Sequence, residues 1–214
     1  PGVERNIAEA LMNLGRTEEA RDVLDRLRKE GSGDESLDAK VNELEDLGRW
    51  GDAIESFREI KSTQALAREQ LAVLIIRYFP QVAEFRQTPQ IVTDTQSSWA
   101  RTEVQVVVGV GLVDPLPNHT FQPSAPATRG EFALAMARLV RLLRVSARTA
   151  PPVSVSDLDS GDALYPEIQL VLGHGLMALD IAGNFSINGD VSGVEAVPAV
   201  ERLLRLSHGK DAQD

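Results

Sequence analysis

The sequence contains no cysteine, which excludes disulfides, thiolate nucleophiles and cysteine-based zinc sites. Its three histidines, His119, His174 and His208, stand singly, without the spacing of a metal site or an acid–base pair. We interpret each of them as a surface residue. Glycine-rich phosphate loops and the motifs that surround serine nucleophiles are also missing. We therefore expect neither enzymatic activity nor a cofactor nor a bound metal.

Long apolar runs are missing as well. The longest, residues 71–76 (LAVLII), is far shorter than the roughly 20 residues of a membrane-spanning helix, which predicts no transmembrane segment in the chain. Lysine and arginine total 22 against 32 acidic residues, and the formal net charge of -10 disfavours nucleic-acid partners and anionic lipids. The 214 residues, 43% of them hydrophobic, suffice for a folded core in one or two domains.

The N-terminal part repeats with a period of 33 residues. Residues 14–20 (LGRTEEA) recur as residues 47–53 (LGRWGDA), and apolar residues at helical spacing follow each copy. We expect the glycine of each copy to end one helix and the alanine to let the next helix pack closely. The pattern resembles the tetratricopeptide repeat, a pair of antiparallel helices that stacks on its neighbours. A generic pair of helical hairpins is the alternative.

The C-terminal part repeats with a constant offset of 64 between residues 103–142 and 167–206. The identical pairs are Glu103/Glu167, Gln105/Gln169, Gly109/Gly173, Gly111/Gly175, Leu112/Leu176, Phe121/Phe185, Glu131/Glu195, Ala135/Ala199, Arg138/Arg202, Leu139/Leu203, Arg141/Arg205 and Leu142/Leu206. The residue pattern of each unit predicts a helix that ends at glycine, a long loop rich in turn residues, and a second helix. We expect Phe121 and Phe185 to anchor the two loops in the core.

Within the first unit, five blocks follow one another in the order and spacing of an S-layer-homology domain. They are residues 93–94 (TD), 99–100 (WA), 109–112 (GVGL), 117–123 (PNHTFQP) and 128–132 (TRGEF). The second unit resembles the same pattern but lacks the tryptophan. The resemblance implies a helical bundle whose grooves bind cell-wall polysaccharide, and family members commonly carry three repeats.

The domain prediction follows from these two repeat systems. We expect an all-α protein with tetratricopeptide-like hairpins at 1–61, a connecting helix and linker at 62–92, repeats at 93–147 and 153–208, and a tail at 209–214. Residues 68–77 align with residues 129–138 and share Arg68 with Arg129. The helix at 62–79 therefore either supplies a third arm of the bundle or ends the first repeat system.

The candidate ligand-binding residues are Arg129, Trp99, Thr128, Glu131 and Arg68. By resemblance, Arg129 would meet an acidic sugar substituent and Trp99 would lie near the glycan groove. Four of these residues have a structural alternative. Thr128 and Glu131 have the spacing of a helix capping box, Trp99 could anchor the core, and Arg129 could be a solvated arginine. The second unit has Gly193 in place of this arginine.

We expect a non-catalytic adaptor of the bacterial cell envelope, in the periplasm or at the cell surface. It would bind a wall polysaccharide, or a polymer linked to peptidoglycan, and hold a protein partner on its tetratricopeptide-like helices. The sequence opens at Pro1, which is compatible with a cleaved or lipidated leader that anchors the protein. The alternative is a scaffold or accessory subunit of a periplasmic or outer-membrane complex that binds no glycan.

Overall fold

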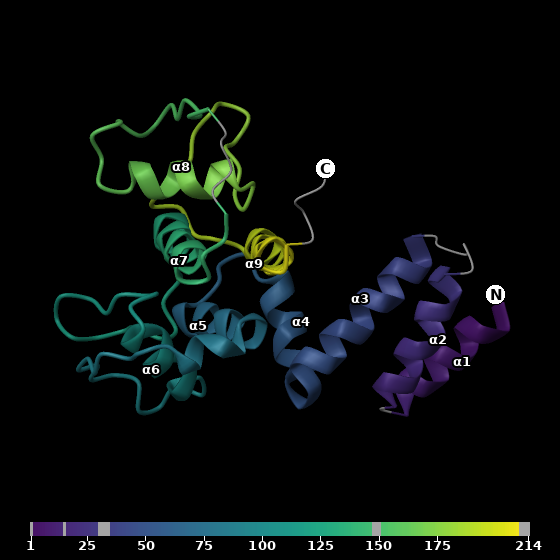
Figure 1. Ribbon diagram of the computed structural model, residues 1–214. Helices are drawn as coiled ribbons and strands as arrows, with labels where there is room; N and C mark the ends of the chain where they lie inside the picture. Colours follow the sequence, from purple (N-terminus) through teal and green to yellow (C-terminus); the bar gives the residue numbers. More distant parts are fainter. Residues whose placement is uncertain (1, 15, 30–34, 147–150, 210–214) are drawn as a thin grey trace. The chain divides into compact units, whose positions relative to one another are not determined.

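In a computed structural model, the chain is described at residues 2–14, 16–29, 35–146 and 151–209 (Figure 1). The predicted all-α fold is confirmed, because these residues form nine α-helices and two short 3-10 helices without a strand. The chain divides into two compact units, Pro1–Arg58 and Glu59–Asp214. The predicted domain boundaries stay predictions, and residues 147 and 210–214 lie outside the described parts.

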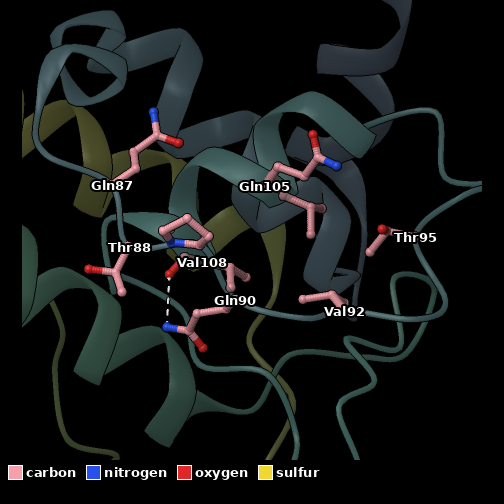
Figure 2. Close-up of a pocket in the computed structure, with 10 residues that line it drawn as sticks. Gln87, Thr88, Gln90, Val92, Thr95, Gln105 and Val108 are labelled. Carbon is pink, nitrogen blue, oxygen red and sulfur yellow. Dashed lines mark hydrogen bonds between the residues drawn. The ribbon is translucent and has the colours of Figure 1, made fainter.

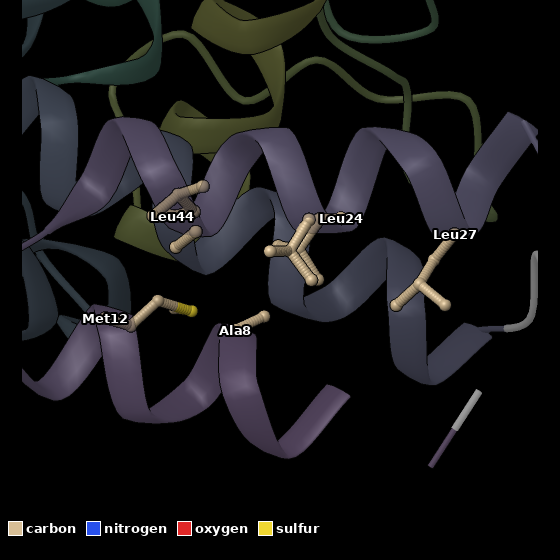
Figure 3. Packing of buried hydrophobic residues seen from close by; sticks show 7 residues of the cluster. Ala8, Met12, Leu24, Leu27 and Leu44 are labelled. Carbon is tan, nitrogen blue, oxygen red and sulfur yellow. The ribbon is translucent and has the colours of Figure 1, made fainter. Parts of the chain in front are cut away.

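Unit 1 contains α1 (Gly2–Asn13), α2 (Thr17–Lys29) and α3 (Glu35–Trp50), and α2 packs against both of the others. A short 3-10 helix, η1 (Gly51–Ala53), then leads into α4 (Ile54–Ser62), which crosses the boundary between the units. One apolar face each of α1, α2 and α3 forms the core shown in Figure 3. Its buried members are Ala8, Met12, Ala20, Val23, Leu24, Leu27 and Leu44.

One prediction for unit 1 is wrong. Gly48 does not end a helix, because α3 continues through it to Trp50. The break comes instead at Gly51, whose φ of 49° lies in the left-handed region that favours glycine. Trp50 and Phe57, on either side of this break, stack with their ring centroids 4.7 Å apart and are buried. The corresponding Gly15 lies outside the described residues.

Unit 2 is built from three longer and two shorter helices. The longer ones are α5 (Arg68–Tyr78), α7 (Arg129–Leu142) and α9 (Gly193–Ser207), and α9 packs against both α5 and α7. The shorter α6 (Arg101–Gly109) packs on α5, and α8 (Tyr165–Gly173) packs on α7. The short η2 (Pro80–Glu84) follows α5. Figure 1 shows the long loops leaving α6 and α8 before the chain returns to α7 and α9.

These shorter helices and their loops form two lobes, which we call the first lobe (residues 85–127) and the second lobe (residues 151–191). Helices α6 and α8 begin and end 64 residues apart, as the repeat predicts. Phe121 and Phe185 are fully buried, so the expected anchoring of both loops is confirmed. Each buried ring contributes about 1.5–3 kcal/mol relative to an exposed one.

A closed ring of three backbone hydrogen bonds joins the starts of the long helices. The N–H of Leu66 donates to Val191 O at 2.8 Å, that of Ala127 to Leu66 O at 2.7 Å, and that of Val191 to Ala127 O at 3.0 Å. Each of these residues lies two positions before α5, α7 or α9. The segment before α5 therefore has the same place in the ring as the segments that end the two lobes.

The prediction that His174 lies at the surface is wrong. Its side chain is buried at the end of α8, with Nδ1 2.8 Å from Leu170 O and Nε2 3.2 Å from Ser146 O. The glycine turn around it places the ring inward, between the end of α8 and the segment after α7. Of the helices in the described residues, none is long and apolar enough to cross a membrane.

Candidate functional site

Arg68, at the start of α5, holds the loop of the first lobe. Its Nε donates to Phe121 O at 2.7 Å, Nη2 donates to Asp114 O at 2.8 Å, and Nη1 pairs with the carboxylate of Glu131. The guanidinium carbon also lies 4.8 Å from the centroid of the Phe121 ring. Because the side chain is only 4% exposed, these contacts replace the water that the charge would otherwise bind.

Arg129, at the start of α7, makes the same set of contacts with the second lobe. Its Nε donates to Phe185 O at 2.7 Å, Nη2 donates to Ala178 O at 3.0 Å, and Nη1 pairs with the carboxylate of Glu195. The guanidinium carbon lies 4.9 Å from the centroid of the Phe185 ring. We call each of these two arrangements an arginine clamp. In each clamp, a long helix holds the lobe that follows it in the sequence.

An aspartate at the entrance of each lobe fixes the same loop from the other side. Asp94 accepts from the N–H groups of Phe121 at 2.7 Å and Gln122 at 2.8 Å, and Asp157 accepts from Phe185 and Ser186, both at 2.7 Å. Gln122 and Ser186 have φ values of 54° and 59°, so the two loops turn in the same unusual conformation.

These contacts favour the ionised carboxylates. Partial desolvation acts to raise the pKa of Asp94, but the backbone N–H groups of Phe121 and Gln122 outweigh it and hold this pKa below its ordinary value. The pKa of Asp157 is lowered chiefly by the N–H of Phe185, against a smaller opposing effect of desolvation. Both loops are therefore braced by a charged group at neutral pH.

Thr128 and Glu131 form the capping box that their spacing predicts. The N–H of Glu131 donates to Thr128 Oγ1 at 3.1 Å, and the N–H of Thr128 donates to Glu131 Oε2 at 3.0 Å. In the second sequence repeat, Ser192 also caps its helix, because its side chain accepts from the N–H of Glu195 at 3.3 Å. The carboxylate of each glutamate also forms an ion pair with a clamp arginine, which sequence reasoning did not anticipate.

The third helix start has no arginine clamp. At Gly193, a Cβ atom would lie 1.7 Å from the carbonyl oxygen of Ile60, so the end of α4 fills the space that a side chain would need. The N–H of Gly193 donates to Thr63 O at 2.9 Å. The chain before α5 thus closes the position at which a third lobe would be held.

Trp99 does not anchor the core. Its side chain is 57% exposed, in the turn that precedes α6. The neighbouring Ser98 donates to Glu69 Oε2 at 2.5 Å, which ties this turn to the start of α5 and therefore to the side of Arg68. Arg129 instead engages the second lobe. The structure thus brings Arg68, Thr128 and Glu131 into one network, whereas Trp99 lies in the first lobe and Arg129 contacts the second.

A cavity of about 280 Å³ opens beside the Arg129 clamp. Its polar lining includes Arg129, Asp180, Asn184 and Ser186. The carboxylate of Asp180 accepts from the N–H groups of Ala182 and Asn184 at 2.8 and 2.9 Å, and this hydrogen bonding to Asn184 is the main cause of its lowered pKa. The cavity therefore presents both a cation and an anion, together with amide and hydroxyl groups. Sequence reasoning found only Arg129 among these residues.

Most of the first lobe is similar to a known domain. Residues 93–133 match the S-layer homology domain. The match covers the first lobe from Asp94 through the capping box of α7. S-layer homology domains are binding modules of the cell envelope or cell surface, which indicates this location for the protein. No curated protein matches the chain.

Proposed function

We propose that the chain is a non-catalytic adaptor of the bacterial cell envelope. Unit 2 would bind a wall or surface polysaccharide, and unit 1 would hold a protein partner. The observation that carries the proposal is the match to an S-layer homology domain in a lobe that presents an exposed tryptophan. We further propose that α5 is the third arm of this bundle, which the backbone ring through Leu66 supports.

Trp99 and Arg129 are the residues that we propose to touch the glycan. An exposed indole offers a flat apolar face to the C–H surface of a sugar ring and one N–H donor at its edge. The guanidinium of Arg129 has five N–H donors, and the clamp uses one on each nitrogen, so the outer ones can face the neighbouring cavity.

The charges around Arg129 favour a neutral sugar over an acidic one. Glu195 balances the guanidinium, and Asp180 lies on the same cavity and would repel a second carboxylate. Sugar hydroxyls, which both donate and accept, suit this mixed lining. The acidic substituent expected from the family resemblance is therefore not part of the proposal.

Arg68, Thr128 and Glu131 act in the proposal as positioning residues. The Arg68 side chain is buried, and all three nitrogens of its guanidinium donate within the unit. Thr128 and Glu131 cap α7. Their joint effect is to fix the loop of the first lobe.

An apolar stripe on unit 1 supports the protein partner. Val3, Ile7 and Leu14 are spaced four and seven residues apart, so a helical path places them on one side. Their side chains are 73%, 45% and 70% exposed. An exposed apolar stripe of this kind is typical of surfaces that bind another helix. A tetratricopeptide-like architecture of this unit remains part of the proposal.

The second candidate is a scaffold or accessory subunit of a periplasmic or outer-membrane complex without glycan binding. One observation favours it, namely that both clamp arginines are engaged inside the protein. Under either function we propose an envelope location, with anchoring through a cleaved or lipidated leader as one route.

The two functions are separated by retention of isolated envelope polysaccharide on the immobilised protein. We expect retention by the native protein, a loss of at least about tenfold, or 1.4 kcal/mol, for Trp99→Ala, and no change for the control Arg101→Ala. No retention, together with a stoichiometric co-purified protein, would establish the scaffold function instead.

A further inference from the structure

The first lobe contains a second cavity that the proposed glycan site does not use. It measures about 280 Å³ and lies between α6 and the segment that precedes it (Figure 2). Its polar lining consists of Gln87, Thr88, Gln90, Thr95 and Gln105, and the other lining residues are three valines, a proline and a glycine. None of these lining residues carries a charge. The cavity therefore suits an uncharged group that exchanges hydrogen bonds with amides and hydroxyls.

The second lobe shows what such a glutamine binds in this fold. Gln169, the counterpart of Gln105, pairs with the main chain of Val153 through two hydrogen bonds. The N–H of Val153 donates to Gln169 Oε1 at 2.8 Å, and Gln169 Nε2 donates to Val153 O at 2.7 Å. A residue can offer its N–H and C=O to one side chain in this way only when its backbone is extended.

Gln105 has no such partner in the first lobe. Its side chain makes no hydrogen bond to any of the described residues, and it is one of the residues that line the cavity (Figure 2). Gln90 turns instead to Val108 O at 3.3 Å, and Thr88 N–H donates to Gly109 O at 2.7 Å. The segment is thus held at the end of α6 and leaves the amide of Gln105 open.

An exposed apolar side chain flanks this cavity in the first lobe. Ile91, between two lining residues, is 73% exposed, and its counterpart in the second lobe is Ser154. An amide without a partner, next to an exposed isoleucine, can bind both the main chain and the apolar side chains of an extended peptide.

We propose that the cavity at Gln105 is a docking site for an extended, uncharged peptide segment of a partner protein. Gln105 pairs with the N–H and C=O of one residue of that segment, as Gln169 does with Val153. The side chains of the partner pack on Ile91 and the neighbouring valines. The net charge of -10 adds a general preference against acidic partners. The site is separate from the proposed glycan contacts of Arg129.

The probe that tests this proposal is acetyl-Pro-Pro-Val-Ser-Val-amide, which copies residues 151–155. We titrate it to about 5 mM into the full ¹⁵N-labelled chain and follow the side-chain amide signals by NMR, because a few hydrogen bonds give millimolar affinity. The Gln105 signals should shift with saturation. The variant Gln105→Leu, at an exposed helix position that tolerates leucine, should bind at least about tenfold more weakly. Thr102→Ala, on the same helix outside the cavity, should bind as the native protein does.

A second peptide tests the main-chain pairing itself. Methylation of the nitrogen of its first valine removes the one N–H that Gln105 would accept, and it should abolish the shifts. The proposal is overturned if the native protein does not respond to the unmodified peptide, or if Gln105→Leu or the methylated peptide binds equally well. It is also overturned if N-acetylglucosamine displaces the peptide and shifts the same signals, since the cavity would then be a sugar subsite.

Discussion

The guanidinium of Arg68 pairs with the carboxylate of Glu131, which lies 63 residues further along the chain. This pair joins the start of α5 to the start of α7, and the loop of the first lobe is held between them. Arg129 and Glu195 form the equivalent ion pair between the starts of α7 and α9. The two arginines differ in burial, because the Arg129 side chain is 16% exposed and that of Arg68 only 4%.

This difference predicts unequal costs of removing the two arginines. Arg68→Ala leaves buried carbonyl groups and a carboxylate without their donor, and we expect a loss of about 2–3 kcal/mol in the free energy of unfolding. Arg129→Ala should cost about 1–2 kcal/mol, because the guanidinium itself and its hydrogen bond to Ala178 O are more exposed to water. Urea unfolding followed by circular dichroism measures both. The exposed Arg101→Ala should change stability by less than about 0.5 kcal/mol, and equal losses for all three variants would contradict the role of the clamps.

The carboxylates that brace the lobes predict an acid-sensitive unit 2. Because the pKa values of Asp94 and Asp157 are lowered in the folded state, their contribution is fully present above the unfolded value of about 3.9. It is lost as the pH falls below that value through the folded pKa. We expect the urea midpoint of native protein to drop between about pH 4 and pH 2.

The paired variant Asp94→Asn with Asp157→Asn isolates this effect. Asparagine keeps one acceptor oxygen but cannot ionise, so the variant should be less stable at neutral pH and should lose less stability on acidification. If the native protein and the variant show the same drop with pH, other carboxylates cause the acid sensitivity.

At Gly193, even the addition of a methyl group should lower the stability of unit 2. A Cβ atom there would overlap the Ile60 carbonyl, so Gly193→Ala must displace the backbone, and it should cost at least about 1–3 kcal/mol. Gly48→Ala provides the contrast, because Gly48 lies inside α3 with open space around its Cα. It should stabilise unit 1 by about 0.5–1 kcal/mol through helix propensity. A neutral Gly193→Ala would show that the chain before α5 does not close the third position.

The backbone ring predicts which fragment folds. Residues 59–209 contain all three long helices and should unfold cooperatively, with the circular dichroism of a helical protein. Residues 93–209 contain both sequence repeats but lack α5, whose Leu71, Leu74 and Ile75 are fully buried. This shorter fragment should be largely unfolded. Cooperative unfolding of residues 93–209 would mean that α5 is dispensable.

Helical periodicity and the offset of 64 predicted the all-α fold, the twin helices α6 and α8, and the burial of Phe121 and Phe185, because each of these depends on local apolar patterning. The capping box of Thr128 and Glu131 was visible for the same reason. The end of α3 was misplaced because two glycines stand close together, and only the backbone conformation shows that Gly51 makes the break.

The clamps lay beyond local patterning, because their partners are 46 to 66 residues apart in the chain. The signal was nevertheless present, since Glu131 and Phe121 recur as Glu195 and Phe185, and the segment of Arg68 aligns with that of Arg129. A recurring charged residue of each sign suggests a recurring ion pair. The exposure of Trp99 and the burial of His174 depend on how the loops turn, which their residue types do not determine.

The ring of Leu66, Ala127 and Val191 has a consequence for how this architecture can vary. Each lobe leaves the central helices and returns to them at the next corner of the ring, so its length does not affect the closure of the other corners. Insertions, deletions or grafted segments at a lobe tip would leave the triangular scaffold intact. Unit 2 thus combines three long helices with two lobes that can change in length and sequence. Its binding specificity can therefore change while the packing of the long helices stays the same.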